Sequence, residues 1–141
     1  MEIKALNEKL EPFGEVIYKY SREDAINDGV FVDISELAKE AGFKIPVAIT
    51  QGVNALLNEE IEGQDFIGRA WDMFTILLLT IKGMNKPDNF IEFKPVFVRA
   101  SNVRNLPSYE KFKPVPVKIW AVIEANNDGS PGMNIMLPSE Y

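Results

Sequence analysis

The chain has 141 residues, of which 46% are hydrophobic and 26% are charged, and its net charge is -6. This length and composition are typical of one globular domain with a single core. Cysteine and histidine are both absent, which excludes disulfides, thiolate nucleophiles, iron–sulfur clusters, Ser-His-Asp triads and nearly all catalytic transition-metal sites.

The start of the chain carries no pattern for secretion or membrane insertion. The segment MEIKALNEKL has no apolar core after its charges, and the longest apolar stretch, MFTILLLTI, is too short to span a bilayer. We therefore expect a cytoplasmic protein without membrane segments. Residues 1–14 have no clear period, which predicts an N-terminal arm ahead of one α+β domain over residues 15–141.

The first helix is predicted from its capping residues. Ser21 is followed three residues later by Asp24, and this spacing is typical of a capping box, in which the hydroxyl and the carboxylate each accept a backbone N–H. Gly29 can adopt the left-handed conformation that ends a helix. The VFV segment after it is then free to extend.

A second capping box is predicted at Asp33 and Glu36. It would start a helix whose apolar residues within 34–41 share one face and which ends at Gly42. The segment FKIPVAIT is predicted to be extended, because the residue before a proline avoids the helical region. Thr50 can then cap a third short helix.

The longest predicted helix runs from Asp65 to Lys82. Its apolar residues lie on more than one face, which predicts a helix that is buried on most sides. Gly83 is expected to end the helix, and NKPDN is expected to form the turn that follows.

After Asn89 the pattern changes to that of strands. FIEFKPVFV alternates, with Pro95 indicating an edge strand or a bulge. ASNVRNLPSYEKFKPVP is predicted to be a long loop, and VKIWAVIEA is predicted to be a central strand. In NNDGSPG, Asp128 and Gly129 are expected to supply the positive φ angles of a hairpin turn, after which MNIML returns antiparallel.

The order of these elements predicts the fold class. Helices come first in the chain and strands come last, which is typical of an α+β layer. We expect several short helices plus one long buried helix, packed on a three- or four-stranded, mainly antiparallel sheet.

Residues 20–50, YSREDAINDGVFVDISELAKEAGFKIPVAIT, resemble an uncharacterised bacterial family, a domain of unknown function often encoded on plasmids, integrative elements and phages. GRAWDMF at residues 68–74, VKIWAVI and the terminal IMLPSEY fit the same pattern. The resemblance covers about residues 18–141, apart from the loop at 100–114. It implies a mobile-element setting and no particular activity.

The segment GRAWD is the strongest candidate site. Arg69 and Asp72 are three residues apart on a helix beside Trp71, and a guanidinium next to an indole could hold an anionic or planar ligand. The simpler interpretation, which we favour, is an ion pair between Arg69 and Asp72 with Trp71 in the core.

A second candidate is the basic region at residues 82–118, which contains eight basic and three acidic side chains. Its loop mixes bases with aromatic residues, a composition that suits single-stranded nucleic acid or an acidic partner. The alternative is that these bases are solvated or pair with the acidic residues of the first half of the chain. The candidate binding residues of this region are Arg99, Arg104, Tyr109, Lys111 and Lys113, with Phe112 among them.

Carboxylates in the first half of the chain could in principle hold a metal ion or act as an acid/base pair. Their spacing fits no calcium loop, and capping already accounts for several of them. We therefore predict no metal site, no cofactor and no catalytic residue. The carboxylates concerned are Glu23, Asp24, Asp28, Asp33 and Glu36.

These features favour a non-catalytic accessory binding protein of a mobile element, which engages a protein partner through its acidic helical half or its basic loop. One alternative is a nucleic-acid-binding module that uses residues 82–118. Another is an enzyme that uses carboxylates and Arg69, although no phosphate-binding loop of the GxGxxG or GxxxxGK[ST] type occurs. The sequence leaves the identity of the partner and the oligomeric state open.

Overall fold

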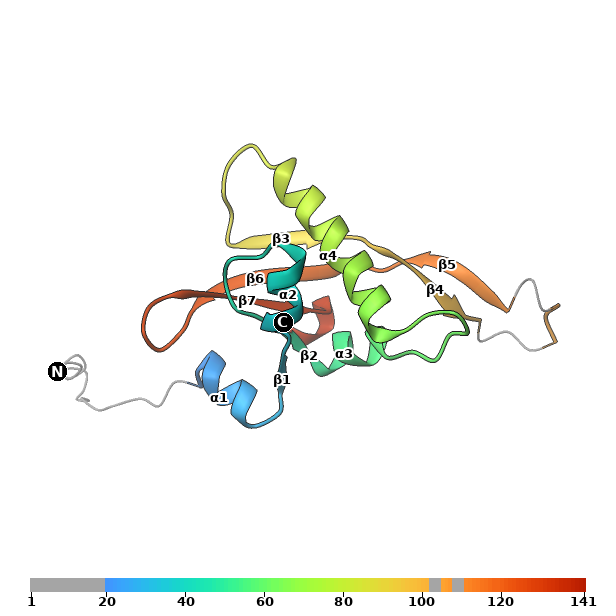
Figure 1. Ribbon diagram of the computed structural model, residues 1–141, viewed down its shortest axis with the longest axis horizontal. Helices are drawn as coiled ribbons and strands as arrows, with labels where there is room; N and C mark the ends of the chain where they lie inside the picture. Colours follow the sequence, from blue (N-terminus) through green and yellow to red (C-terminus); the bar gives the residue numbers. More distant parts are fainter. Residues whose placement is uncertain (1–19, 102–104, 108–110) are drawn as a thin grey trace.

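The computed structural model describes residues 20–101, 105–107 and 111–141. They form an α+β fold, as predicted, in which four helices and a short 3-10 helix accompany seven strands (Figure 1). In chain order the elements are α1 Arg22–Asn27, β1 Phe31–Asp33, α2 Ser35–Ala41, β2 Val47–Thr50, α3 Gln51–Leu57, α4 Phe66–Lys82, β3 Phe90–Phe93, β4 Val96–Ala100, β5 Phe112–Pro116, β6 Ile119–Ala125, β7 Pro131–Met136 and η2 Pro138–Glu140.

The strands form a five-stranded mixed sheet in the order β1-β2-β7-β6-β3 and a separate two-stranded sheet of β4 and β5. All neighbouring strands are antiparallel except β2 and β7, which are parallel. The predicted three or four mainly antiparallel strands were therefore too few, and the parallel pair was missed. Parallel strands need a long crossover connection, so no local turn residue indicates their pairing.

The predicted capping residues of α1 and α3 are confirmed. Ser21 Oγ accepts from the backbone N–H of Asp24 at 3.0 Å, and the Asp24 carboxylate accepts from the N–H of Ser21 at 3.2 Å. Gly29 follows with φ at 78°, which releases the chain into β1. Thr50 caps α3 by accepting from the N–H of Val53.

The capping box predicted at Asp33 and Glu36 is wrong in detail. The Asp33 carboxylate accepts from both the N–H and the hydroxyl of Ser35, at 2.9 and 2.6 Å. Asp33 therefore closes a local turn with Ser35. The N-cap of α2 is the next residue, Ile34, whose side chain makes no capping hydrogen bond. The predicted stop is confirmed, because Gly42 has φ at 111°.

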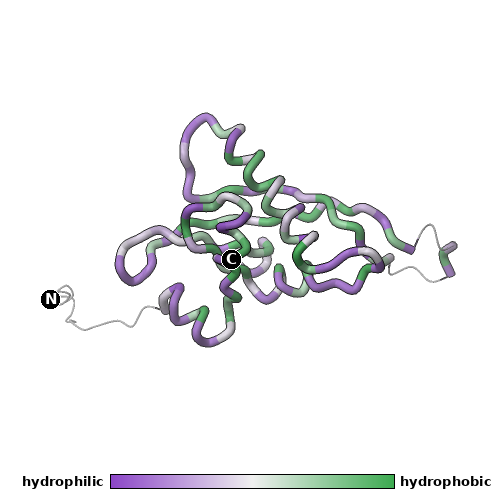
Figure 2. Tube along the Cα trace, in the orientation of Figure 1, coloured by the Kyte–Doolittle hydropathy of each residue, from purple (hydrophilic) through white to green (hydrophobic). Residues whose placement is uncertain are grey.

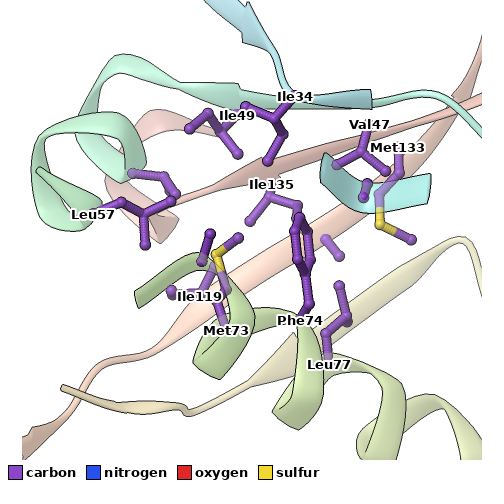
Figure 3. Packing of buried hydrophobic residues seen from close by; sticks show 14 of the residues in the cluster. Ile34, Val47, Ile49, Leu57, Met73, Phe74, Leu77, Ile119, Met133 and Ile135 are labelled. Carbon is purple, nitrogen blue, oxygen red and sulfur yellow. The ribbon is translucent and has the colours of Figure 1, made fainter. Parts of the chain in front are cut away.

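The core lies between α2, α3 and α4 and one face of the five-stranded sheet (Figure 3). In Figure 2 hydrophobic residues concentrate where α4 meets the strands, and the loop that leaves α4 is hydrophilic. Phe74 and Leu77 of α4 are fully buried, whereas Ile67 and Leu79 are 56% and 60% exposed. The prediction that this helix is buried on most sides was therefore wrong, because the helix packs on a sheet from one side only.

The opposite face of the sheet is covered near β7 by α1. Arg22 is buried, and its Nε–H donates to Asn134 Oδ1 at 2.7 Å, while its other nitrogens donate to Asn126 Oδ1 and to the carbonyl of Met133. Asn134 in turn donates to the carboxylate of Glu124. Burial lowers the pKa of Arg22, and the carboxylates of Asp33, Glu124 and Glu23 oppose this shift.

The hairpin between β6 and β7 forms as predicted, with Gly129 at a φ of 86°. Asp128 does not share the positive φ that we expected, since Asn105 is the single non-glycine residue with positive φ in the described part of the chain. The Asp128 carboxylate instead accepts from the N–H and the hydroxyl of Ser130.

The carboxylate of Glu140 holds the end of the chain against the start of α3. It accepts from the Thr50 hydroxyl, from the Gly52 N–H at 2.9 Å and from the Leu137 N–H at 2.9 Å. A Cβ atom at Gly52 would lie 2.6 Å from Glu140 Oε2. The glycine is therefore needed for the close approach of this carboxylate.

We expect Glu140→Ala to lower the free energy of unfolding by about 1–2 kcal/mol, since it removes charge-assisted bonds at a helix N-terminus. In that background Gly52→Ala should become stabilising by up to about 1 kcal/mol, because alanine favours a helix and the closest contacts of its methyl group, those with the Glu140 carboxylate, are then absent. Urea unfolding of the two single variants and the double variant measures both effects. Equal effects of Gly52→Ala in both backgrounds would contradict the contact with Glu140.

Candidate functional site

Strands β3 and β4 run one after the other along one side of a long hairpin, and β5 and β6 run back along the other side. β4 pairs with β5 and β3 pairs with β6, while the residues between the two ladders are outside the regular pairing. Phe93 pairs with Ile119 and Val96 pairs with Pro116, so the pairing continues across the gap without an inserted residue. The Val117 N–H also donates to the carbonyl of Pro95 at 2.9 Å. We name this ribbon, residues 90–100 paired with 112–122, the long hairpin.

Part of the long hairpin corrects the prediction of a loop at residues 100–116. Residues 112–116 are strand β5, paired along its whole length with β4. In Figure 1 these two strands extend away from the five-stranded sheet. As for Pro95, β3 is an edge strand as predicted, and the continuous pairing leaves no bulge.

The prolines of β5 explain why the sequence did not indicate a strand. Ser101 donates to the carbonyl of Lys111 and Val117 donates to that of Pro95, so the odd-numbered residues form the hydrogen-bonded pairs of this ladder. The backbone nitrogens of Pro114 and Pro116 therefore lie at the free edge. Because proline has no N–H, these two positions offer no donor to an added strand.

The two faces of the long hairpin differ in their surroundings. The odd-numbered side chains lie on the side of the core, where Phe93, Phe97 and Ile119 are buried, although Val115 farther along this side is 37% exposed. The even-numbered side chains point the other way, and Phe90, Val96 and Phe112 are 38%, 54% and 45% exposed. We name this second side the outer face, formed by Phe90, Glu92, Lys94, Val96, Val98, Ala100, Phe112, Pro114, Pro116, Lys118, Trp120 and Val122.

An aromatic cluster occupies the end of the outer face beside β7. The rings of Phe90 and Trp120 are edge-to-face at 4.7 Å, and Tyr141 packs against both, at 6.1 and 5.5 Å. The indole N–H of Trp120 donates to the Glu92 carboxylate at 3.0 Å. Tyr141 remains 78% exposed, so this end presents aromatic surface to solvent.

Arg69 joins four segments at the base of β4. Its Nε–H and Nη2 donate to the carbonyl of Leu56, Nη1 donates to Gln64 Oε1 and to the carbonyl of Val98, and Nη2 also donates to Glu59 Oε1 at 2.8 Å. These are five bonds from a group that has five N–H donors. The guanidinium is 1% exposed, and burial lowers its pKa while the charge of Glu59 opposes the shift.

The segment GRAWD is therefore not one site. Arg69 points into the protein, whereas Trp71 is 37% exposed and Asp72 is exposed on α4. The ion pair that we predicted between Arg69 and Asp72 is wrong in its partner, because Arg69 pairs with Glu59. The prediction of a core tryptophan at Trp71 is also wrong.

Glu59 brings together two of the predicted binding residues. Its second oxygen pairs with Arg99 Nη2 at 2.6 Å, so one carboxylate bridges Arg69 and Arg99. Sequence analysis missed Glu59 because it lies in an acidic link that is typical of a solvated surface. For Arg99, the interpretation that the basic region pairs with acidic residues of the first half is confirmed.

The other predicted binding residues do not gather at this ion pair. Lys113 is exposed and lies opposite Arg99 on β5, and Lys111 is exposed just before β5. Arg104 and Tyr109 lie outside the described residues. The inner side of the long hairpin thus carries Arg99, Lys111 and Lys113 beyond the buried Phe97.

Four of the five first-half carboxylates make hydrogen bonds within the fold, and the fifth, Glu36, is exposed on α2. Asp24 completes the capping box, Asp33 closes the turn before α2, Asp28 accepts from the Tyr20 hydroxyl, and Glu23 accepts from the N–H of Asn127. Over residues 20–101, 105–107 and 111–141, no three carboxylates come close enough together to hold a metal ion.

The described helices also include none with the length and apolar content that crossing a membrane requires.

Among known proteins, no curated protein and no solved structure matches this chain. One family model does match, over residues 8–141, and it describes a family of unknown function, DUF6573. The match also includes residues 8–17 and the segment 100–114, which the sequence resemblance left out. The chain belongs to the DUF6573 family of unknown function.

Proposed function

We propose that this chain is a non-catalytic binding protein, a cytoplasmic accessory of a mobile element, that engages a partner protein through the outer face of its long hairpin. One observation carries the proposal. The uninterrupted pairing places Val96, Val98, Phe112, Pro114 and Pro116 together on a side of the ribbon that faces away from the core. Exposed apolar surface of this kind is typical of a protein interaction site.

The dimensions of the hairpin also support a protein partner. Each of its two sides spans eleven residues, nine of them paired in the ladders, which is about 35 Å at 3.3 Å per residue and long enough for an interface of ordinary size. The prolines of β5 disfavour the addition of a strand at the free edge. A partner is then expected to cover a face of the hairpin, and the outer face is the one with Val96 and Phe112 exposed together.

The enzyme alternative receives little support from the chemistry of Arg69. All of its N–H donors are engaged by the protein, and the guanidinium is buried, so no donor remains for a substrate. The nucleic-acid alternative has more support, since Lys111 and Lys113 are exposed on the inner side. It predicts an affinity for DNA or RNA that falls steeply with salt, which a protein partner does not require.

Site-specific photo-crosslinking in host lysate tests the proposal. A photoreactive phenylalanine is placed at Phe112 on the outer face or, as the matched control, at Leu79, which is 60% exposed on α4. We expect a protein adduct from position 112 that Val96→Glu abolishes, and no such adduct from position 79. The proposal fails if both positions give the same adducts, or if position 112 gives adducts only with nucleic acid.

A further inference from the structure

Two lysines lie opposite each other in the middle of the outer face. The pairing on both sides, Phe93 with Ile119 and Val96 with Pro116, places Lys94 across from Lys118. Both side chains are exposed, and neither takes part in an ion pair within the described residues. Like charges directly opposite on one face of a ladder repel each other. The isolated protein therefore holds a local excess of positive charge at this point.

The nearest carboxylate on the outer face forms no ion pair with these lysines within the described residues. Glu92 lies two residues before Lys94 and opposite Trp120, and its Oε1 accepts the indole N–H of Trp120. A carboxylate held in this way is turned toward the aromatic cluster. The two lysines thus keep the capacity to bind an anion from outside the chain.

Apolar surface lies on both sides of the lysine pair. Trp120 is two residues along the ribbon in one direction, and Val96 with Pro116 is two residues along in the other, each about 7 Å away at 3.3 Å per residue. A ligand that reached both lysines would also contact these side chains. A free inorganic anion would leave them exposed, whereas a polypeptide could cover them.

We infer that the outer face binds a polypeptide segment of the partner protein in which a carboxylate lies between apolar side chains. The carboxylate is held between the ammonium groups of Lys94 and Lys118. One group of apolar side chains packs on the aromatic cluster, and the other packs on Val96 and Phe112. This inference rests on the proposed function, because it names the chemistry of the partner for the same face.

The inference gives the lysine pair opposite effects on stability and on binding. In Lys118→Glu the repulsion becomes an attractive cross-strand pair, so the thermal midpoint of the isolated protein should rise. The same change should lower the affinity of the protein for an acidic peptide by about tenfold or more, since a charged contact is replaced by repulsion. A residue with a merely structural role would not raise stability and lower affinity together.

Peptide display against the full chain tests the inference. A library of random twelve-residue peptides is selected on the wild-type protein and, in parallel, on the Lys94→Glu/Lys118→Glu variant. Lys44→Glu/Lys86→Glu, which reverses two exposed lysines outside the long hairpin, is the matched control. We expect peptides with Asp or Glu between apolar residues on the wild-type and control proteins, and Lys or Arg at that place on the reversed protein.

The outcomes separate the two proposals. The relevant peptides are those that no longer bind when Val96 is changed to Glu. If these peptides lack an acidic residue between their apolar residues, or if the peptides selected on the reversed protein still have one there, the inference is overturned and the proposed function stands. If no selected peptide depends on Val96, both fail. Binding of a fluorescent oligothymidylate that the lysine reversal abolishes, in the absence of any acidic peptide, would replace the inference with nucleic-acid binding.

Discussion

Arg69→Met is expected to lower the free energy of unfolding by about 3–5 kcal/mol, the usual cost of removing one partner of a buried ion pair. The substitution removes both guanidinium donors from the carbonyl of Leu56, and it leaves Glu59 Oε1 with the Arg99 Nε–H alone. It also frees the carbonyl of Val98, which couples β4 to the rest of the protein. Urea unfolding, followed by tryptophan fluorescence, measures the change.

Two further variants make this result specific to the geometry of Arg69. Lysine keeps the charge but has three donors on one nitrogen and cannot reach both carbonyls and Glu59 together, so Arg69→Lys should also be clearly destabilising. Asp72→Asn changes an exposed residue of the same segment and should stay within about 0.5 kcal/mol of the wild type. If Asp72→Asn lowered the free energy of unfolding as much as Arg69→Met does, the segment GRAWD would act as one ion-pair site after all.

Arg22→Leu is expected to have the second largest effect, a loss of about 2–3 kcal/mol, because a charged donor is removed from buried acceptors. Asn134 is 2% exposed, and its side-chain oxygen would lose the Nε–H of Arg22. The Met133 carbonyl would lose its bond to the same group.

A double-mutant cycle with Asn134→Ala isolates the contact between the two side chains. We expect a coupling energy of about 1–3 kcal/mol, since residues in one hydrogen-bond network are not additive. Additive effects would show that the bond between Arg22 and Asn134 does not contribute to stability, and that α1 is held by the other contacts of Arg22 and by packing. Glu36→Gln, on the exposed side of α2, is the control and should change the free energy of unfolding by less than about 0.5 kcal/mol.

The sequence was informative wherever a structure depends on neighbouring residues. The caps at Ser21 and Thr50, the glycine stop at Gly42 and the turn at Gly129 all follow from side chains within a few positions of one another. Asp33 was the exception among the caps, because an aspartate can cap a helix or close a turn with the next serine, and the sequence does not distinguish these bonds.

The features that depend on distant residues could not be predicted. Arg22 and Asn134 are 112 positions apart, and Glu59 and Arg99 are 40 apart. No spacing rule connects such pairs, because the fold alone brings them together. Composition was also misleading, since the prolines of β5 are typical of a loop and are tolerated in this strand only because their nitrogens lie at its free edge.

Among the candidate binding residues, Arg69 and Arg99 were predicted from the sequence as possible binding residues, and the structure places both in ion pairs of the fold. Both were expected in exposed or helical sites, and Glu59 instead holds them together at the base of the long hairpin. The outer face was not predicted, because its even-numbered pattern becomes visible only once residues 112–116 are known to be a strand in register with β4.

Amide hydrogen exchange of the full chain, alone and with the partner protein identified by crosslinking, tests most directly whether the outer face of the long hairpin is the binding surface. Binding there should slow exchange in residues 112–122 and in 90–100, and should leave α2 and the exposed side of α4 unchanged. Protection confined to α2 or α4, with the hairpin amides exchanging as they do in the free protein, would contradict the account.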